Sequence, residues 1–276
     1  MDAFWNGVLA FARTTTDRVG RQLLADFGTV QAAQKTDGSL VTQADRWADE
    51  QLQAAIAQRF PDHGILSEEA QHTFPNRDWC WAIDPVDGTT NFTRGIPIWG
   101  ISMGLLYRGV PVFGLVHFPG LGQTFHGFWY GDSGLSGPTG AFCNDHPIRT
   151  SADAPSSNHL FNLCARSTSL AAQPFPCKLR MVGVCTYSFL LVATGAALGA
   201  EEATPKVWDL AAVWPILQAA GGSSLPLTPE AIFPLVVGQD YGQTSYPSLV
   251  VGRADLVPVF RPLVAEIADR VLAAQQ

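Results

Sequence analysis

Hydrophobic residues recur at helical spacing at the start of the chain. Between residue 2 and about residue 27, apolar side chains at Phe4, Val8, Phe11, Val19 and Leu23 are separated by polar residues. Separations of three, four, seven or eight positions place such residues on one face of a helix. The pattern therefore predicts one or two amphipathic helices in this segment.

A second helix is expected after a turn at Asp37-Gly38. It begins at about Thr42, carries Leu52 and Ile56 on its apolar face, and ends at Pro61, because proline cannot continue a helix.

Two short strands and an antiparallel sheet are expected next. The segments "HGILSEEA" (63–70) and "DWCWAI" (78–83) are apolar runs that lead into acidic residues, and the second delivers Asp84 at its C-terminal end. From residue 98 to 129 apolar and small residues alternate, with turn signals at 108–109 and 119–120. This alternation predicts a central antiparallel sheet.

The second half of the chain mixes strands with helices. Loops are expected at 131–140 and 152–158, a strand at 160–164 and an apolar helix from about 187 to 198. Another helix begins at Asp209 and ends at Gly221-Gly222, which suit a left-handed cap, and a buried strand and a C-terminal helix follow. Runs of strands separated by helical layers favour a layered mixed α/β domain, of the α+β kind, over a regular parallel array.

Composition narrows the classes of function. The chain has 276 residues, 47% of them apolar and 15% charged, and its formal charge of −7 disfavours broad electrostatic binding to nucleic acid or to anionic lipid. The five cysteines form no CxxC pair, which favours reduced thiols in a cytoplasmic protein. We find no secretory signal pattern and no apolar run long enough for a membrane span. We therefore expect a cytoplasmic protein with neither a nucleic-acid nor a membrane partner.

The segment "DPVDGTT" (84–90) is the strongest candidate for chemistry. Proline fixes φ and bends the chain, so Asp84 and Asp87 can converge while the Val86 carbonyl turns inward beside them. Mg²⁺ prefers such oxygen ligands, and a helix beginning at Gly88-Thr89 would offer N–H groups to a phosphate. The same residues also compose a common turn, so the segment alone leaves metal binding and simple turn formation both open.

Further acidic residues lie at the ends of predicted elements. Glu68 and Glu69 follow a strand, and Asp209 begins a helix, where it could equally serve as a capping residue. Carboxylates that converge without a cation repel one another, and divalent ions would remove this conflict. We expect that such ions would also give a negatively charged chain a positive site for an anionic substrate.

Six blocks together resemble the inositol monophosphatase family of metal-dependent, lithium-sensitive phosphatases. In chain order they are "LVTQAD" (40–45), "ILSEEA" (65–70), "WAIDPVDGTTNF" (81–92), "GAFCND" (140–145), "LLVATG" (190–195) and "VWDLAAVWPILQAAGG" (207–222). The order and spacing of the blocks are more specific than any single block, and they cover most of the chain.

The resemblance implies roles for particular residues. Two to three Mg²⁺ ions would be held by Glu68, Asp84, the Val86 carbonyl, Asp87 and Asp209. Glu68 and Thr89 would position and activate the attacking water, with Asp45 supporting them. The substrate would contact Gly88, Thr89, Gly183, Val184, Cys185 and Glu202.

The resemblance also implies a fold and an assembly. The fold is a layered α-β-α-β-α sandwich of the inositol monophosphatase and fructose-1,6-bisphosphatase type, present as a homodimer. The whole chain, residues 1–276, would be one domain of two packed lobes. The first, to about residue 143, would carry most metal ligands, and the second, from about 144, would carry the substrate turn and Asp209.

The activity implied is that of a phosphoric monoester hydrolase. The expected substrate is a small polyol or sugar phosphate, with inositol 1-phosphate the leading candidate, attacked by metal-activated water without a phosphoenzyme. Histidinol phosphate and fructose bisphosphate remain alternatives within the fold, as does a non-catalytic interaction protein. Two features leave the substrate open: Cys185 replaces a small residue on the substrate turn, and Lys206 could either bind a second anionic group or be an ordinary exposed lysine.

Overall fold

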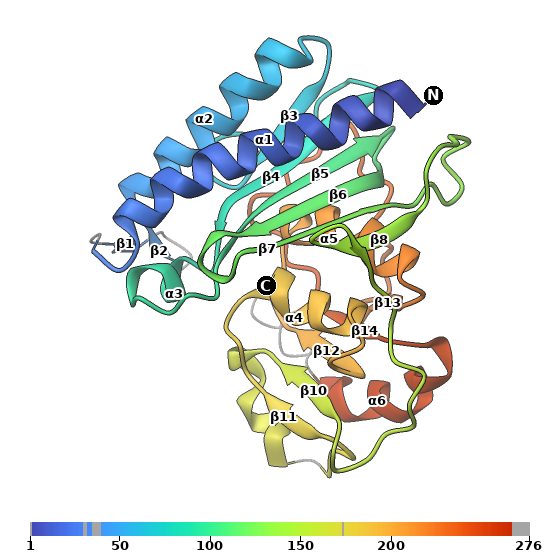
Figure 1. Ribbon diagram of the computed structural model, residues 1–276. Helices are drawn as coiled ribbons and strands as arrows, with labels where there is room; N and C mark the ends of the chain where they lie inside the picture. The colour runs from blue at the N-terminus through green and yellow to red at the C-terminus, as the bar shows by residue number, and fades with distance from the viewer. Residues whose placement is uncertain (1, 30–31, 35–39, 173, 267–276) are drawn as a thin grey trace.

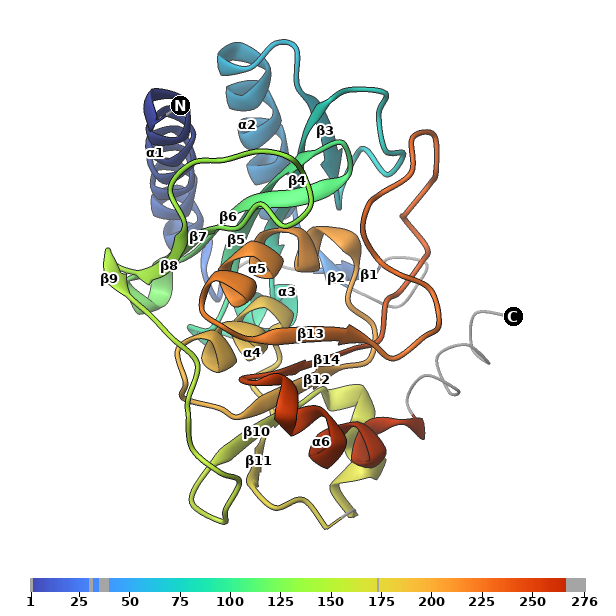
Figure 2. The ribbon, with the colours of Figure 1, turned by 90° about the vertical axis from the view of Figure 1, so that its right-hand side faces the viewer.

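Two β-sheets and the helices around and between them form five layers (Figures 1 and 2). This computed structural model describes residues 2–29, 32–34, 40–172 and 174–266. Helices α1 and α2 cover one face of the larger sheet, helices α4 and α5 lie between the two sheets, and helix α6 covers the far face of the smaller sheet. The predicted layered α-β-α-β-α arrangement is confirmed.

The larger sheet has seven strands in the order β3-β4-β5-β6-β7-β8-β9. Their bounds are β3 Gly64–Ser67, β4 Trp79–Asp87, β5 Gly100–Tyr107, β6 Val110–Phe118, β7 Gln123–Phe128, β8 Gly140–Cys143 and β9 His146–Pro147, with the 3₁₀ helix η1 at Pro119–Leu121. Strand β3 runs parallel to β4, and all other pairs are antiparallel. The antiparallel sheet predicted between residues 98 and 129 is therefore confirmed.

Helices α1 (Asp2–Asp26) and α2 (Gln43–Arg59) pack on the outer face of this sheet (Figure 1). Successive residues of a strand point to opposite faces. Accordingly Trp81 belongs to the core under α1 and α2, whereas Cys80 and Ala82 belong to the core on the α5 side. The first predicted segment forms one helix rather than two. The predicted turn at Asp37-Gly38 lies outside the described residues, between the short paired strands β1 (Ala33–Gln34) and β2 (Leu40–Val41).

Helix α5 (Val207–Ala219) lies very close to the inner face of the larger sheet. The close approach depends on Gly104 and Gly114, which pair across β5 and β6. A Cβ atom on Gly114 would come within 1.8 Å of the Ala212 carbonyl oxygen, and one on Gly104 within 2.7 Å of the Ala211 carbonyl carbon. These two glycines therefore bring α5 against the sheet, and its first turn against the end of β4. The helix begins two residues before the predicted start and ends before Gly221, whose φ of 95° agrees with the predicted left-handed cap.

The smaller sheet has five strands in the order β11-β10-β12-β14-β13. The bounds of its strands are β10 Leu160–Leu163, β11 Lys178–Arg180, β12 Gly199–Glu202, β13 Ser223–Pro226 and β14 Ser248–Val251. The helical elements beside it are α4 Cys185–Ala193 on the inner side and η2 Ala165–Ala172, η3 Ala254–Leu256 and α6 Val257–Val264. The apolar helix predicted to reach residue 198 ends earlier, because Gly195 takes a φ of 76° and the chain then enters β12. Residues 267–276 of the predicted C-terminal helix lie outside the described residues.

Strand β12 carries two buried glutamates that point in opposite directions. Glu202 is near Ser188 of α4, on the inner side of the sheet. Glu201 lies near Ser167 of η2, on the opposite side, where the surrounding core is apolar. This strand was not among the elements predicted from the sequence.

Among the helices of the described residues, none combines the length and the apolar character needed to cross a membrane.

Candidate functional site

Three aspartates from distant parts of the chain meet at the inner end of strand β4. One carboxylate oxygen from each of Asp84, Asp87 and Asp209 lies within 4.8 Å of the other two. Asp84 and Asp87 are 2% and 7% exposed, and Asp209 is half-buried. The cluster is therefore a compact acidic centre with little contact with water.

A β-bulge, rather than a turn, brings Asp84 and Asp87 together. Strand β4 continues past Asp84 to Asp87, so the expectation that it stops at Asp84 was wrong. Asp84 pairs with Ser102 and Asp87 pairs with Gly100, so three steps along β4 face two steps along β5. The extra residue falls at Pro85 and Val86, where proline is tolerated because a bulge interrupts the ladder of hydrogen bonds.

Asp209 reaches the cluster from the first turn of α5. The Lys206 N–H donates to Asp209 Oδ2 over 2.7 Å. The Ser102 hydroxyl, opposite Asp84 in the sheet, donates to the Trp208 carbonyl over 3.3 Å. Asp209 therefore acts as a helix-capping acid, as one expectation held, and also faces the other two aspartates.

Glu68 borders the acidic centre from the end of β3. Its N–H donates to the Ile83 carbonyl over 3.2 Å, which continues the pairing of β3 with β4. Its carboxyl group shares a hydrogen bond with Asp84. The structure thus brings together four of the acidic residues that the sequence singled out. The N–H of the neighbouring Glu69 donates to the Ser67 hydroxyl over 3.2 Å.

Burial and mutual repulsion disfavour ionisation of the cluster. Burial, followed by the charges of Glu68, Asp87 and Asp209, raises the pKa of Asp84 well above its usual range. Burial, with Asp87 and Glu68, does the same to the pKa of Asp209. Burial also raises the pKa of Asp87 to about 6, although donors from Thr186 and Cys185 oppose the shift. Such a group of carboxyls must either hold protons or be neutralised by a cation.

The donor set fits a hard divalent cation. All three clustered side chains present carboxylate oxygens, and oxygen-only ligands suit Mg²⁺ or Ca²⁺ better than a softer transition metal. The bridging hydrogen bonds that Asp84 shares with Glu68 and Asp209 need protons that a cation would displace.

Thr89 connects the acidic centre to helix α2. Its hydroxyl lies 3.0 Å from Asp45 Oδ1 and 3.1 Å from the Val86 carbonyl oxygen, so its one proton is directed at these two acceptors. Asp45 is held in turn by the N–H of Thr42 at 2.8 Å and by the Thr42 hydroxyl, in a capping box that starts α2. The Val86 N–H donates to Asp84 Oδ1 over 2.9 Å. A local helix start thus fixes the hydroxyl at the site.

Asp49 is a buried acid that the sequence analysis missed. It lies one turn after Asp45 on the buried face of α2, and it accepts hydrogen bonds from the hydroxyl of Ser67 and the amide of Gln53. Burial raises its pKa, and the charge of Glu68 adds to the shift. The spacing of four residues from Asp45 on a helix was the signal that could have found it.

The start of helix α4 faces Asp87 and Gly88. The Thr186 N–H donates to Asp87 Oδ2 over 2.8 Å, and the Thr186 hydroxyl donates to the same oxygen. Gly88 has a φ of 95°, and a Cβ atom there would lie 2.6 Å from the Val184 side chain. The predicted substrate turn, Gly183 to Cys185, therefore packs directly on the start of helix α3 (Thr89–Thr93). Thr186 had no sequence signal beyond following Cys185.

Asn91 of helix α3 holds the same turn from below. Its side-chain amide donates to the Val182 carbonyl over 3.0 Å and to the Ile98 carbonyl over 2.9 Å. Gly183 sits against this amide in the left-handed region, with a φ of 73°.

Glu202 and Cys185 lie beyond Asp87, on the side of the smaller sheet. Burial raises the pKa of Glu202 to about 7, while Ser188 and Cys164 oppose the shift and Asp87 adds to it. Burial, and then the nearby Asp209, Glu202 and Asp87 carboxylates, raise the pKa of the Cys185 thiol, so it is not an activated nucleophile. Lys206 directs its ammonium at the Gly242 carbonyl, 3.2 Å away.

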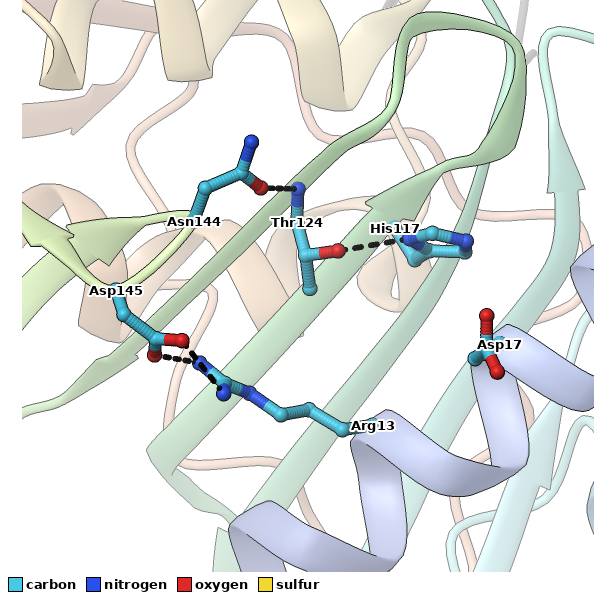
Figure 3. Close-up of a pocket in the computed structure, with 6 residues that line it drawn as sticks. All are labelled: Arg13, Asp17, His117, Thr124, Asn144 and Asp145. Atoms are coloured by element: carbon cyan, nitrogen blue, oxygen red, sulfur yellow. Dashed lines mark hydrogen bonds and ion pairs between the residues drawn. The ribbon is translucent and has the colours of Figure 1, made fainter.

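A separate cavity of about 270 Å³ lies between α1 and the β6–β7 hairpin (Figure 3). Its lining residues are Arg13, Asp17, His117, Thr124, Asn144 and Asp145. Arg13 is paired with Asp145, and His117 Nδ1 lies 2.8 Å from the Thr124 hydroxyl. Because the Asp145 carboxylate already neutralises the Arg13 guanidinium, the lining residues offer no uncompensated positive charge to a phosphate.

Several known proteins resemble this chain in sequence or in fold. A model of the inositol monophosphatase family matches residues 5–253. The chain is 32% identical to the histidinol-phosphatase of Chlorobaculum parvum over 233 residues, which is 78% of this chain and 83% of the relative. It is 34% identical to the inositol-1-monophosphatase of Synechocystis over 217 residues, 74% of this chain and 73% of the relative. The solved structure of an IMPase from Thermotoga maritima superposes with a TM-score of 0.77 at 24% identity, over 98% of this chain and all of the other.

Proposed function

The chain belongs to the inositol monophosphatase family of phosphatases, and we propose that it is a Mg²⁺-dependent phosphomonoesterase that hydrolyses a small polyol or sugar phosphate. Inositol 1-phosphate is the first candidate substrate. The observation that carries the proposal is the buried cluster of Asp84, Asp87 and Asp209, which needs a cation to be stable in its ionised form.

In this proposal the ions are held by Glu68, Asp84, the Val86 carbonyl, Asp87 and Asp209. Bound there, two to three Mg²⁺ ions would neutralise the substrate phosphate and lower the pKa of a bound water. The positions of the four acids around the end of β4 support this ligand set.

Thr89 and Glu68 orient the attacking water in this proposal. Because the Thr89 hydroxyl directs its proton at Asp45 Oδ1 or at the Val86 carbonyl, its lone pairs are available to accept a hydrogen bond from water. Asp45 keeps Thr89 in this orientation, while the Gly88 and Thr89 N–H groups receive phosphate oxygens at the start of α3. No residue of the chain forms a covalent bond with the substrate.

The leaving group of the ester would lie toward Gly183, Val184, Cys185 and Glu202. Glu202, with a pKa of about 7, can accept a hydrogen bond from a substrate hydroxyl when it is ionised and donate one when it is protonated. Val184, packed against Gly88, limits the space beside the phosphate.

Phosphate release measures the proposed activity. Purified protein with Mg²⁺ and inositol 1-phosphate should release phosphate, and the same protein in excess EDTA should not. The Asp87→Asn variant is the matched control, because it keeps the shape of the side chain and removes its charge. Release by the wild type that does not exceed that of Asp87→Asn would refute the proposal.

Histidinol phosphate is the second candidate substrate. It is favoured by the 32% identity to a protein named histidinol-phosphatase. An ionised Glu202 could pair with the ammonium group of an amino alcohol as well as with a hydroxyl. The ratio of kcat/KM for histidinol phosphate and inositol 1-phosphate decides between the two, with fructose 1,6-bisphosphate as a third arm. The predicted homodimer is tested separately, by light scattering of the purified protein.

A further inference from the structure

A loop from late in the chain crosses to the metal-binding end of the larger sheet. This crossing loop, residues 235–246, is part of the connection between β13 and β14. Figure 2 shows it in orange, rising from the smaller sheet beside the segment that follows β3. The Phe74 N–H donates to the Gln239 carbonyl, and the Gly238 N–H donates to the Phe74 carbonyl, both over 2.9 Å. Thr73 and Asp240 form an isolated antiparallel bridge between them.

The crossing loop is also attached to the segment that leads into α5. The Tyr246 N–H donates to the Pro205 carbonyl over 2.8 Å. The Lys206 ammonium donates to the Gly242 carbonyl over 3.2 Å. The loop therefore joins the segment that follows Glu68 to the segment that precedes Asp209.

His72 lies where these segments meet. Its Nε2 donates to the Glu68 carbonyl over 2.8 Å, because a carbonyl oxygen can only accept. Its ring packs on Trp208, the residue before Asp209, with ring centroids 5.6 Å apart. Its own carbonyl accepts the Tyr241 N–H over 2.9 Å. One imidazole thus contacts the main chain of one acidic residue and the immediate neighbour of another.

Gly242 closes over the other side of this ring. A Cβ atom on Gly242 would lie 2.8 Å from His72 Nδ1, so only glycine leaves room for the imidazole in this position. Gly242 is held there by its N–H, which donates to Asp240 Oδ1 over 2.8 Å, and by Lys206. The His72 ring is therefore enclosed by Trp208, the Glu68 main chain and the crossing loop.

We propose that His72 is a positioning residue of the metal site, which sets the distance between Glu68 and Asp209, and that the crossing loop holds its ring in place. The inference rests on the proposed function, because it assigns His72 to the same ions. His72 itself neither binds the ion nor touches the substrate. Partners that orient metal ligands in this way typically change metal affinity by about 10- to 100-fold when they are removed.

The test is the affinity for Mg²⁺ without substrate, measured by calorimetry and by the rise in melting temperature on adding Mg²⁺. His72→Leu removes the donor and should weaken Mg²⁺ binding about tenfold. His72→Gln keeps an N–H that can reach the Glu68 carbonyl and should restore part of the affinity. His146→Leu, at an exposed histidine of β9, is the matched control and should bind Mg²⁺ like the wild type.

A second variant keeps the proposal testable if His72→Leu does not fold. Gly242→Ala leaves His72 unchanged but pushes its ring aside, and it should also weaken Mg²⁺ binding. At saturating Mg²⁺ both variants should regain most of the wild-type kcat, with KM for inositol 1-phosphate unchanged.

Two results overturn the inference. One is wild-type Mg²⁺ affinity in His72→Leu or, if that variant does not fold, in Gly242→Ala. The other is a loss of melting temperature in EDTA without any loss of Mg²⁺ affinity, which would give His72 a purely structural role. Failure of the proposed function is distinguishable, because the wild type itself would then neither bind Mg²⁺ nor release phosphate.

Discussion

Glu201→Gln should change how the stability of the protein depends on pH. Glu201 is fully buried, and neither of its carboxyl oxygens has a hydrogen-bond partner of normal geometry among the described residues. Burial in the apolar core of the smaller sheet raises its pKa to about 8, from 4.5. The folded protein therefore keeps a proton on Glu201 at neutral pH, whereas the unfolded chain does not.

The sign of the effect follows from this difference in bound protons. Between pH 4.5 and about 8 the folded state binds one more proton at Glu201 than the unfolded state, so the free energy of unfolding falls as pH rises. A full proton corresponds to ~1.4 kcal/mol per pH unit. From pH 6.5 to 8 the Glu201 contribution is therefore a loss of ~2 kcal/mol, which is about 4–8 °C in melting temperature for a protein of this size.

This pH window lies above the pKa values of two histidines in the folded protein. Burial lowers the pKa of His63 and of His126 to about 4, so both are neutral in the folded state throughout the window. The two histidines change the free energy of unfolding in the opposite direction and at lower pH. As pH drops from about 6.5 towards 4, the unfolded chain takes up protons that the folded protein does not bind, so the free energy of unfolding falls. The other raised carboxyls are present in both proteins, so the difference between the variant and the wild type at each pH reports Glu201 and its repulsion with Glu202.

Urea unfolding in EDTA, at half-unit steps from pH 6.5 to 8, measures the predicted difference. The wild type should lose ~2 kcal/mol more over this range than Glu201→Gln, whatever the absolute stability of the variant. Glu230→Gln, at an exposed position, is the matched control and should follow the wild type. Parallel curves for Glu201→Gln and the wild type would show that Glu201 is ionised in the folded protein, and the reasoning from burial would be refuted.

Three further results are expected. Thr186→Val removes the hydroxyl donor to Asp87 and should weaken Mg²⁺ binding about tenfold in a calorimetric titration, whereas Thr186→Ser should bind like the wild type. Equal Mg²⁺ affinities of Thr186→Val and the wild type would show that the hydroxyl does not orient Asp87. Gly114→Ala should lower the free energy of unfolding by ~3 kcal/mol or more, since its Cβ atom would overlap the Ala212 carbonyl. Gly7→Ala on α1 is the control and should raise the free energy of unfolding by up to ~1 kcal/mol. An unchanged free energy of unfolding for Gly114→Ala in urea would mean that α5 can move away from the sheet. Mg²⁺ should raise the melting temperature of the wild type and not that of Asp87→Asn, and an equal rise in both would place the ion elsewhere.

The local sequence was sufficient to predict features that depend only on neighbouring residues. Thr42 and Asp45 form a capping box within one turn of helix, so the start of α2 and the burial of Asp45 beside it follow from a short segment. The same holds for Gly221, whose left-handed conformation ends α5.

Features that depend on distant partners could not be predicted in this way. The bulge at Pro85 is defined by the pairing of Asp84 with Ser102 and of Asp87 with Gly100 on the next strand. The local sequence, with Pro85 and Gly88 close together, predicts a turn equally well. Strand β12 has four residues, two of them glutamates, and its burial comes from the strands and helices packed around it. The position of His72 depends on Gly242, which is far away in the sequence.

The placement of Asp209 on α5 has a consequence for biosynthesis. Asp84 and Asp87 leave the ribosome more than a hundred residues before Asp209 does. Until α5 follows, Gly104 and Gly114 on the inner face of the larger sheet lack the helix that packs on them. The nascent chain therefore cannot assemble the acidic centre as its strands emerge. The proposed metal site can therefore acquire its full set of ligands only after α5 has been made.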